Sequence, residues 1–73
     1  VHALIKDEFI QRAINALPDK FREVIVFRDI QELSYEEISK IVEIPLGTVK
    51  SRVNRGRLKL QEKLSKYLEE MRD

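Results

Sequence analysis

The chain has 73 residues, no cysteine and a single histidine, His2. We therefore expect one domain over residues 1–73, without a disulfide framework, a cysteine-ligated zinc site or any cofactor. The formal net charge is only +1, and no apolar run approaches the roughly 20 residues that a membrane-spanning helix needs. We expect a cytoplasmic domain without a membrane partner, and because the sequence opens on Val1 in mid-pattern, a piece of a longer protein.

Two helices are predicted in the first half of the chain. Residues 3–17 have apolar side chains three or four positions apart, which predicts an amphipathic helix that ends before Pro18. The members of this stripe are Ile5, Phe9, Ala13 and Ala16. A second helix is predicted over residues 19–30, and its apolar run at residues 24–27 either lies at the centre of the fold or offers a surface to a partner.

Two further helices are predicted in the second half. Ser34 and Glu37 match a capping box, so a third helix should begin near Ser34, with Ile38, Ile41 and Val42 on one face. A turn before Pro45 should lead into a long fourth helix over residues 46–70. Its apolar stripe consists of Leu46, Val49, Val53, Leu60, Leu64, Leu68 and Met71. The expected fold is a small all-α, four-helix domain with a helix-turn-helix over about residues 34–60 and a long C-terminal recognition helix.

Positive charge is concentrated in residues 45–60, which contain five basic residues and no acidic one: Lys50, Arg52, Arg55, Arg57 and Lys59. A polyanion responds to such a local block rather than to the average charge. A basic run on a helix is often only a solvated face, but its position after a capped helix and a tight turn favours nucleic-acid binding.

The second helix of a helix-turn-helix reads base edges in the major groove with its N-terminal part. The residues expected to contact bases are Lys50, Ser51, Asn54 and Arg55. Those expected to contact phosphates are Gly47, Thr48, Arg52, Arg57 and Lys59. For Arg57 a second role is open, in which its stem lies on the core and its guanidinium pairs with an acid of the second helix. Gly56 is either a close-packing position or merely tolerated.

No nucleophile-base set, metal cluster or phosphate loop is visible in the sequence, so we predict no enzymatic activity. Neighbouring carboxylates such as Glu36 and Glu37 diverge by about 100° on a helix, which argues against paired acid-base chemistry.

The span from Ala16 to Leu60 resembles region 4 of bacterial sigma factors of the sigma-70 class, closest to the extracytoplasmic-function group. The motifs that carry the resemblance are LP at residues 17–18, LSYEEIS at residues 33–39 and GTVKSR at residues 47–52. The resemblance implies binding to the promoter −35 element, docking on the β flap of RNA polymerase and control by an anti-sigma factor. By position, the base-contacting residues of the family correspond to Lys50, Ser51, Asn54 and Arg55. The resemblance also implies that Val26 and Phe27 are apolar because they dock on the polymerase.

Two other interpretations stay open. The DNA-binding effector domain of LuxR-type response regulators has a similar four-helix plan and a similar TVK, but usually a lysine where Gly47 stands and a histidine where Arg52 stands. A helical protein-interaction module without DNA binding is the other alternative, with the leucines of the C-terminal tail as a short coiled-coil seam.

Overall fold

The computed structural model describes the backbone of residues 2–70 and the side chains of residues 8–70. The elements are α1 (His2–Asn15), α2 (Asp19–Ile25), the π-helical turn η1 (Val26–Ile30), α3 (Tyr35–Val42) and α4 (Leu46–Glu70). Over the described residues the fold is all-α, with four α-helices, as predicted. The start of α3 after Ser34 and both bounds of α4 also agree with the prediction.

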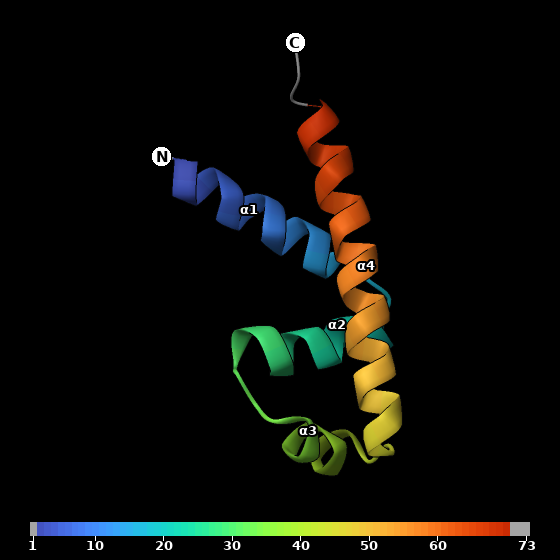
Figure 1. Cartoon of the computed structure of the whole chain (residues 1–73). Coiled ribbons are helices and arrows are strands. Elements are labelled where there is room, and N and C mark those ends of the chain that lie inside the picture. The colour runs from blue at the N-terminus through green and yellow to red at the C-terminus, as the bar shows by residue number, and fades with distance from the viewer. Residues whose placement is uncertain (1, 71–73) are drawn as a thin grey trace.

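The helices are arranged around α4, which is the longest element (Figure 1). α3 lies at the N-terminal end of α4, α2 packs across its middle, and α1 meets it further along (Figure 1). Only Glu43, Ile44 and Pro45 separate α3 from α4, so this pair forms the predicted helix-turn-helix. Within residues 2–70, no helix is long and apolar enough to cross a membrane.

The prediction of one α-helix over residues 19–30 was wrong in its second half. α2 ends at Ile25, and the next five residues form a π-helical turn in which the Gln31 amide donates to the Val26 carbonyl. We attribute the change to Arg28, the next residue in the inward spacing of Phe21, Val24 and Ile25. In the wider turn Arg28 is half-buried: its guanidinium donates to the Leu33 carbonyl at 3.0 Å, while its Nε is buried without a hydrogen-bond partner among the described residues.

The core forms where α2, α3 and α4 meet. Its buried members are Leu17, Phe21, Val24, Ile25, Ile38, Val49 and Val53. Val49 and Val53 come from the predicted stripe of α4, and Ile38 is the one fully buried residue of α3. Val24 and Ile25, the first half of the apolar run, are therefore central in the fold, whereas Val26 and Phe27 are half-buried in η1.

Three residues of the predicted apolar stripes are exposed. Ile41 is 54% exposed on α3, and Leu68 is 62% exposed on α4, where it lines an open groove with Phe9 and Ile10 of α1. Ala16 is exposed in the turn after α1, which ends at Asn15 rather than at residue 17, and Ile14 is buried in its place. Met71 and the side chain of Ile5 lie outside the described residues.

Candidate nucleic-acid interface

The first helix of the motif has a fully formed N-terminal cap. The Ser34 hydroxyl accepts a hydrogen bond from the Glu37 amide at 3.1 Å, and the Glu37 carboxylate accepts one from the Ser34 amide at 3.0 Å. Hydrogen bonds with Ser34 lower the pKa of Glu37 below its usual value, and the larger effect comes from the bond with the Ser34 backbone amide. The capping box therefore fixes where α3 begins and holds Glu37 at the cap.

The turn between α3 and α4 is fixed by left-handed backbone and by one hydroxyl. Glu43 has φ 56° and ψ 48°, which ends α3 in an αL conformation. The Ser39 hydroxyl donates to the Ile44 carbonyl at 2.6 Å, and the Pro45 carbonyl accepts from the amides of Thr48 and Val49. Pro45 thus immediately precedes the first residue of α4, Leu46, and the Ser39 hydroxyl of α3 holds the backbone of the turn before it.

The four residues predicted to contact bases are Lys50, Ser51, Asn54 and Arg55, and all four are exposed. They lie on the part of α4 opposite the buried Val49 and Val53. Gly47 is also exposed, and an added Cβ there would meet no atom within 4 Å. The N-terminal half of α4 therefore presents one open face, and the structure brings the four predicted residues together on it.

The predicted phosphate contacts lie at the flanks of this face. Thr48 and Arg52 are half-buried, whereas Lys59 is exposed. The Lys59 ammonium group lies 5.4 Å from the centre of the Phe21 ring on α2. Thr48, Arg52 and Lys59 therefore border the open face along one side.

Lys50 lies at the other edge of the face, beside α3. Its ammonium group is 6.0 Å from the centre of the Tyr35 ring, and the Arg28 guanidinium is 5.0 Å from the same ring. The ring of Tyr35 therefore interacts with one cation from η1 and one from α4.

Arg57 shows one part of the second role considered from the sequence, since it pairs with an acid. Its Nε donates to Asp29 Oδ2 at 3.1 Å and its terminal nitrogen donates to Asp29 Oδ1 at 2.5 Å. This bidentate hydrogen bond to Asp29 raises the pKa of the Arg57 guanidinium. The acid lies in η1, within the span that the sequence assigned to the second helix.

Gly56 is a close-packing position. It is buried between α4 and α2, and an added Cβ would lie 2.9 Å from Cγ1 of Ile25 and 3.4 Å from Cβ of Phe21. The missing side chain therefore lets the two helices approach closely.

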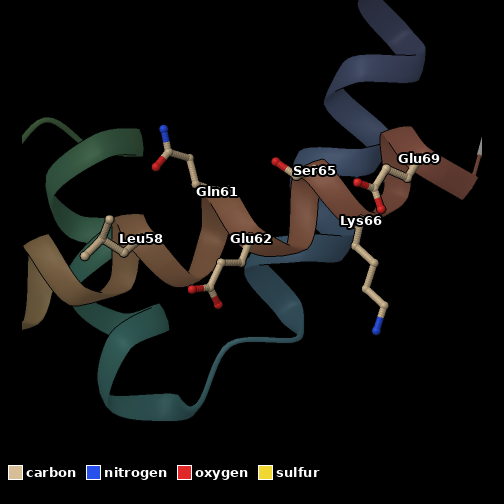
Figure 2. A pocket seen from close by; sticks show the side chains of 6 residues that line it. All are labelled: Leu58, Gln61, Glu62, Ser65, Lys66 and Glu69. Carbon is tan, nitrogen blue, oxygen red and sulfur yellow. The ribbon is translucent and has the colours of Figure 1, made fainter.

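The C-terminal half of α4 has a different surface. A shallow depression of about 440 Å³ lies along this half. In Figure 2, the side chains of Glu62 and Lys66 point outward from the helix. Its lining residues are Leu58, Gln61, Glu62, Ser65, Lys66 and Glu69. Acidic side chains reappear here, so the purely basic face ends at Lys59. Among the described residues, no group of three or more side chains could hold a metal ion.

The two residues considered for polymerase docking lie in η1 and are both half-buried. Phe27 packs against the core cluster, and Val26 does not belong to it. Ile30, in the same turn, is 50% exposed. The turn therefore has an apolar surface on the side away from the core.

The contacts that Asp29 and Tyr35 make with α4 join distant parts of the chain, so sequence spacing could not identify them in full. The sequence offered an acid of the second helix as a partner for Arg57, but only the structure identifies it as Asp29. Ser39 could have been identified, because a serine near the end of a helix often bonds the backbone of the following turn.

Comparison with known proteins identifies the family. The model of the family described as Sigma-70, region 4 matches residues 8–60, more than half of the chain. The chain is 54% identical over 55 residues to the ECF RNA polymerase sigma factor SigW of Bacillus subtilis, covering 75% of this chain and 29% of that protein. It is 46% identical over 61 residues to the ECF RNA polymerase sigma factor SigE of Mycolicibacterium smegmatis, covering 84% of this chain and 24% of that protein.

A third relative is the ECF RNA polymerase sigma-E factor of Escherichia coli, 40% identical over 57 residues, covering 78% of this chain and 30% of that protein. The chain thus spans between about a quarter and a third of the length of these three relatives. These matches favour the sigma factor resemblance over the LuxR-type alternative. A helix-turn-helix with an open basic face, a matching family model and relatives of the same kind all agree: the chain belongs to the sigma-70 region 4 family.

Proposed function

We propose that this chain recognises the −35 element of promoters as part of an alternative sigma factor, which directs RNA polymerase to those promoters. The observation that carries this proposal is the open face of α4, where Lys50, Asn54 and Arg55 project without a neighbouring acid on the same face. A helix fits the major groove, which is about 12 Å wide, and side chains of these types read base edges there.

Each group on the face has a proposed role. Lys50, Ser51, Asn54 and Arg55 contact base edges, with Arg55 the strongest discriminator because its guanidinium can bond guanine through two donors. The backbone amides of Gly47 and Thr48, at the start of α4, and the side chains of Arg52 and Lys59 hold phosphates and set the register of the helix. Arg57 has a separate role, because it is held in an ion pair with Asp29.

The proposed partners follow from the same assignment. The apolar surface of Val26 and Phe27 docks on the β flap of the polymerase, and an anti-sigma factor regulates the protein by covering its binding surfaces. The domain acts by positioning and not by catalysis, and it works in the cytoplasm, on the nucleoid, where promoters and polymerase meet.

The test compares two duplexes, one with a GGAAC-like −35 sequence and one with the same bases scrambled. Binding is measured over a salt series for the wild-type chain and for Arg55→Ala. We expect the wild type to prefer the element and Arg55→Ala to lose that preference, a change of about 1–3 kcal/mol in discrimination. The salt slope should fall by only about one unit, because a single cation is removed.

Equal binding of the wild type to both duplexes would contradict base readout. It would favour the alternative of a helical protein-interaction module. One observation supports that alternative: an apolar groove of about 230 Å³ lies between α1 and the end of α4, lined by Phe9, Ile10, Leu64 and Leu68.

A further inference from the structure

We propose that Asp29 sets the overall DNA affinity and the salt dependence of this domain by holding Arg57 away from DNA phosphates. The inference rests on the proposed function, since it assumes that α4 binds DNA. Asp29 would act as an internal substitute for a phosphate group, and Arg57 would be a basic residue of the recognition helix that does not contact DNA.

The geometry of the pair supports an exclusive contact. Both Asp29 oxygens accept from Arg57, at 3.1 and 2.5 Å, so the guanidinium uses two of its donors on this carboxylate. Arginine binds phosphate groups through the same bidentate arrangement. Asp29 and a DNA phosphate therefore compete for the same N–H donors of the Arg57 guanidinium.

The neighbouring side chains do not draw Asp29 away from its ion pair with Arg57. The neighbouring cation, Arg28, donates to the Leu33 carbonyl and lies over the Tyr35 ring instead. Within the described part of the chain, the one ion pair of Arg57 is with Asp29. The side chains of Arg57 and Asp29 are 47% and 35% exposed. A DNA phosphate could therefore reach Arg57 and compete with Asp29 for its guanidinium.

The position of Arg57 on α4 explains why the competition matters. Arg57 follows Lys50 by seven residues, which places both on one edge of the helix, about 10 Å apart along its axis. A helix in the major groove has phosphate walls on both sides, and an unpaired arginine on this edge could reach one of them. Such a contact raises affinity for every sequence equally, because phosphates carry no sequence information.

The experiment measures binding of the full 73-residue chain to the −35 and scrambled duplexes over a salt series. The variants are Asp29→Asn, Arg57→Gln and the double variant. We expect Asp29→Asn to bind both duplexes more tightly by the same factor, with a salt slope steeper by about 0.9, the value of one added phosphate contact. Arg57→Gln should leave the slope unchanged, and the double variant should return the Asp29→Asn slope to that of the wild type.

The matched control is Glu23→Gln, which removes the same charge from an exposed position of α2. It should not change the slope. A slope that falls by about 0.9 in Arg57→Gln would overturn the proposal, because Arg57 would then already contact a phosphate. A changed preference between the duplexes in Asp29→Asn at constant slope would also overturn it, because Asp29 would then act by orienting α4.

The experiment distinguishes failure of one proposal from failure of the other. If the wild type shows no preference between the duplexes, −35 recognition is contradicted. The salt slopes of the variants on either duplex still test whether Asp29 holds Arg57 away from phosphates. A thermal unfolding curve for each variant shows that the compared proteins are folded.

Discussion

A single missing methyl group at position 56 decides how closely α2 and α4 approach. Because a Cβ there would lie 2.9 Å from Ile25, a side chain that is itself 1% exposed, the neighbouring atoms have little room to move. We expect Gly56→Ala to be destabilising. Overpacking of this kind costs about 1–3 kcal/mol, whereas alanine recovers about 1 kcal/mol of helix propensity, so the net loss reaches about 2 kcal/mol in urea unfolding.

The chain contains its own control for this substitution. Gly47 lies in the same helix with no atom within 4 Å of an added Cβ, so Gly47→Ala should be neutral or stabilising by up to about 1 kcal/mol. Equal effects at both positions would show that helix propensity, and not the contact with Ile25, governs Gly56. The sequence shows that Gly56 is an unusual residue within a helix. Only the packing of α2 on α4 shows that it is a close-packing position and not merely a tolerated glycine.

Among the elements, α3 depends most directly on its local sequence. The cap formed by Ser34 and Glu37 lowers the pKa of Glu37 relative to the unfolded chain, so the charged carboxylate stabilises the folded state. This contribution is fully present above the unfolded pKa and is lost as the pH falls through the lowered folded pKa. We expect the wild type to be more stable than Glu37→Gln at neutral pH, with the difference disappearing in acid.

Unfolding by urea at about pH 7 and about pH 3 measures this difference. Glutamine can form the same capping bond without charge, so the comparison isolates the charge. Glu36→Gln is the control, because Glu36 is a neighbouring exposed carboxylate outside the capping box. An identical pH dependence for both variants would contradict a specific effect of the cap.

Element boundaries were predictable where a local signal exists and not where packing decides. Pro18, the Ser34 capping box and Pro45 each act within a few residues, and the boundaries they predicted lie close to the observed ones. The turn η1 was missed because its cause, an arginine at an inward position, becomes evident only when the core is assembled. The open face of α4 follows from helical spacing, but the Asp29–Arg57 pair joins residues 28 positions apart and required the tertiary structure.

At the scale of the whole molecule, the basic face and the apolar surface of η1 belong to different parts of the domain. The cations lie on α4, where DNA is proposed to bind, whereas Val26 and Phe27 lie on the turn after α2. Although the Asp29–Arg57 pair joins the turn to α4, the two sets of residues lie on different elements. The proposed DNA binding and the proposed polymerase docking can therefore be tested with separate substitutions.

We expect Val26→Ser and Phe27→Ser to separate docking from core packing. Phe27 packs against the core cluster, so its substitution should lower the free energy of unfolding by roughly 1–3 kcal/mol and weaken binding to a purified β-flap fragment. Val26 is half-buried outside that cluster, so its substitution should weaken flap binding with a smaller loss of stability. Both variants should keep the preference for the −35 duplex, because α4 is unchanged. Unaltered flap binding in a folded Val26→Ser variant would show that the polymerase contacts another surface of the domain.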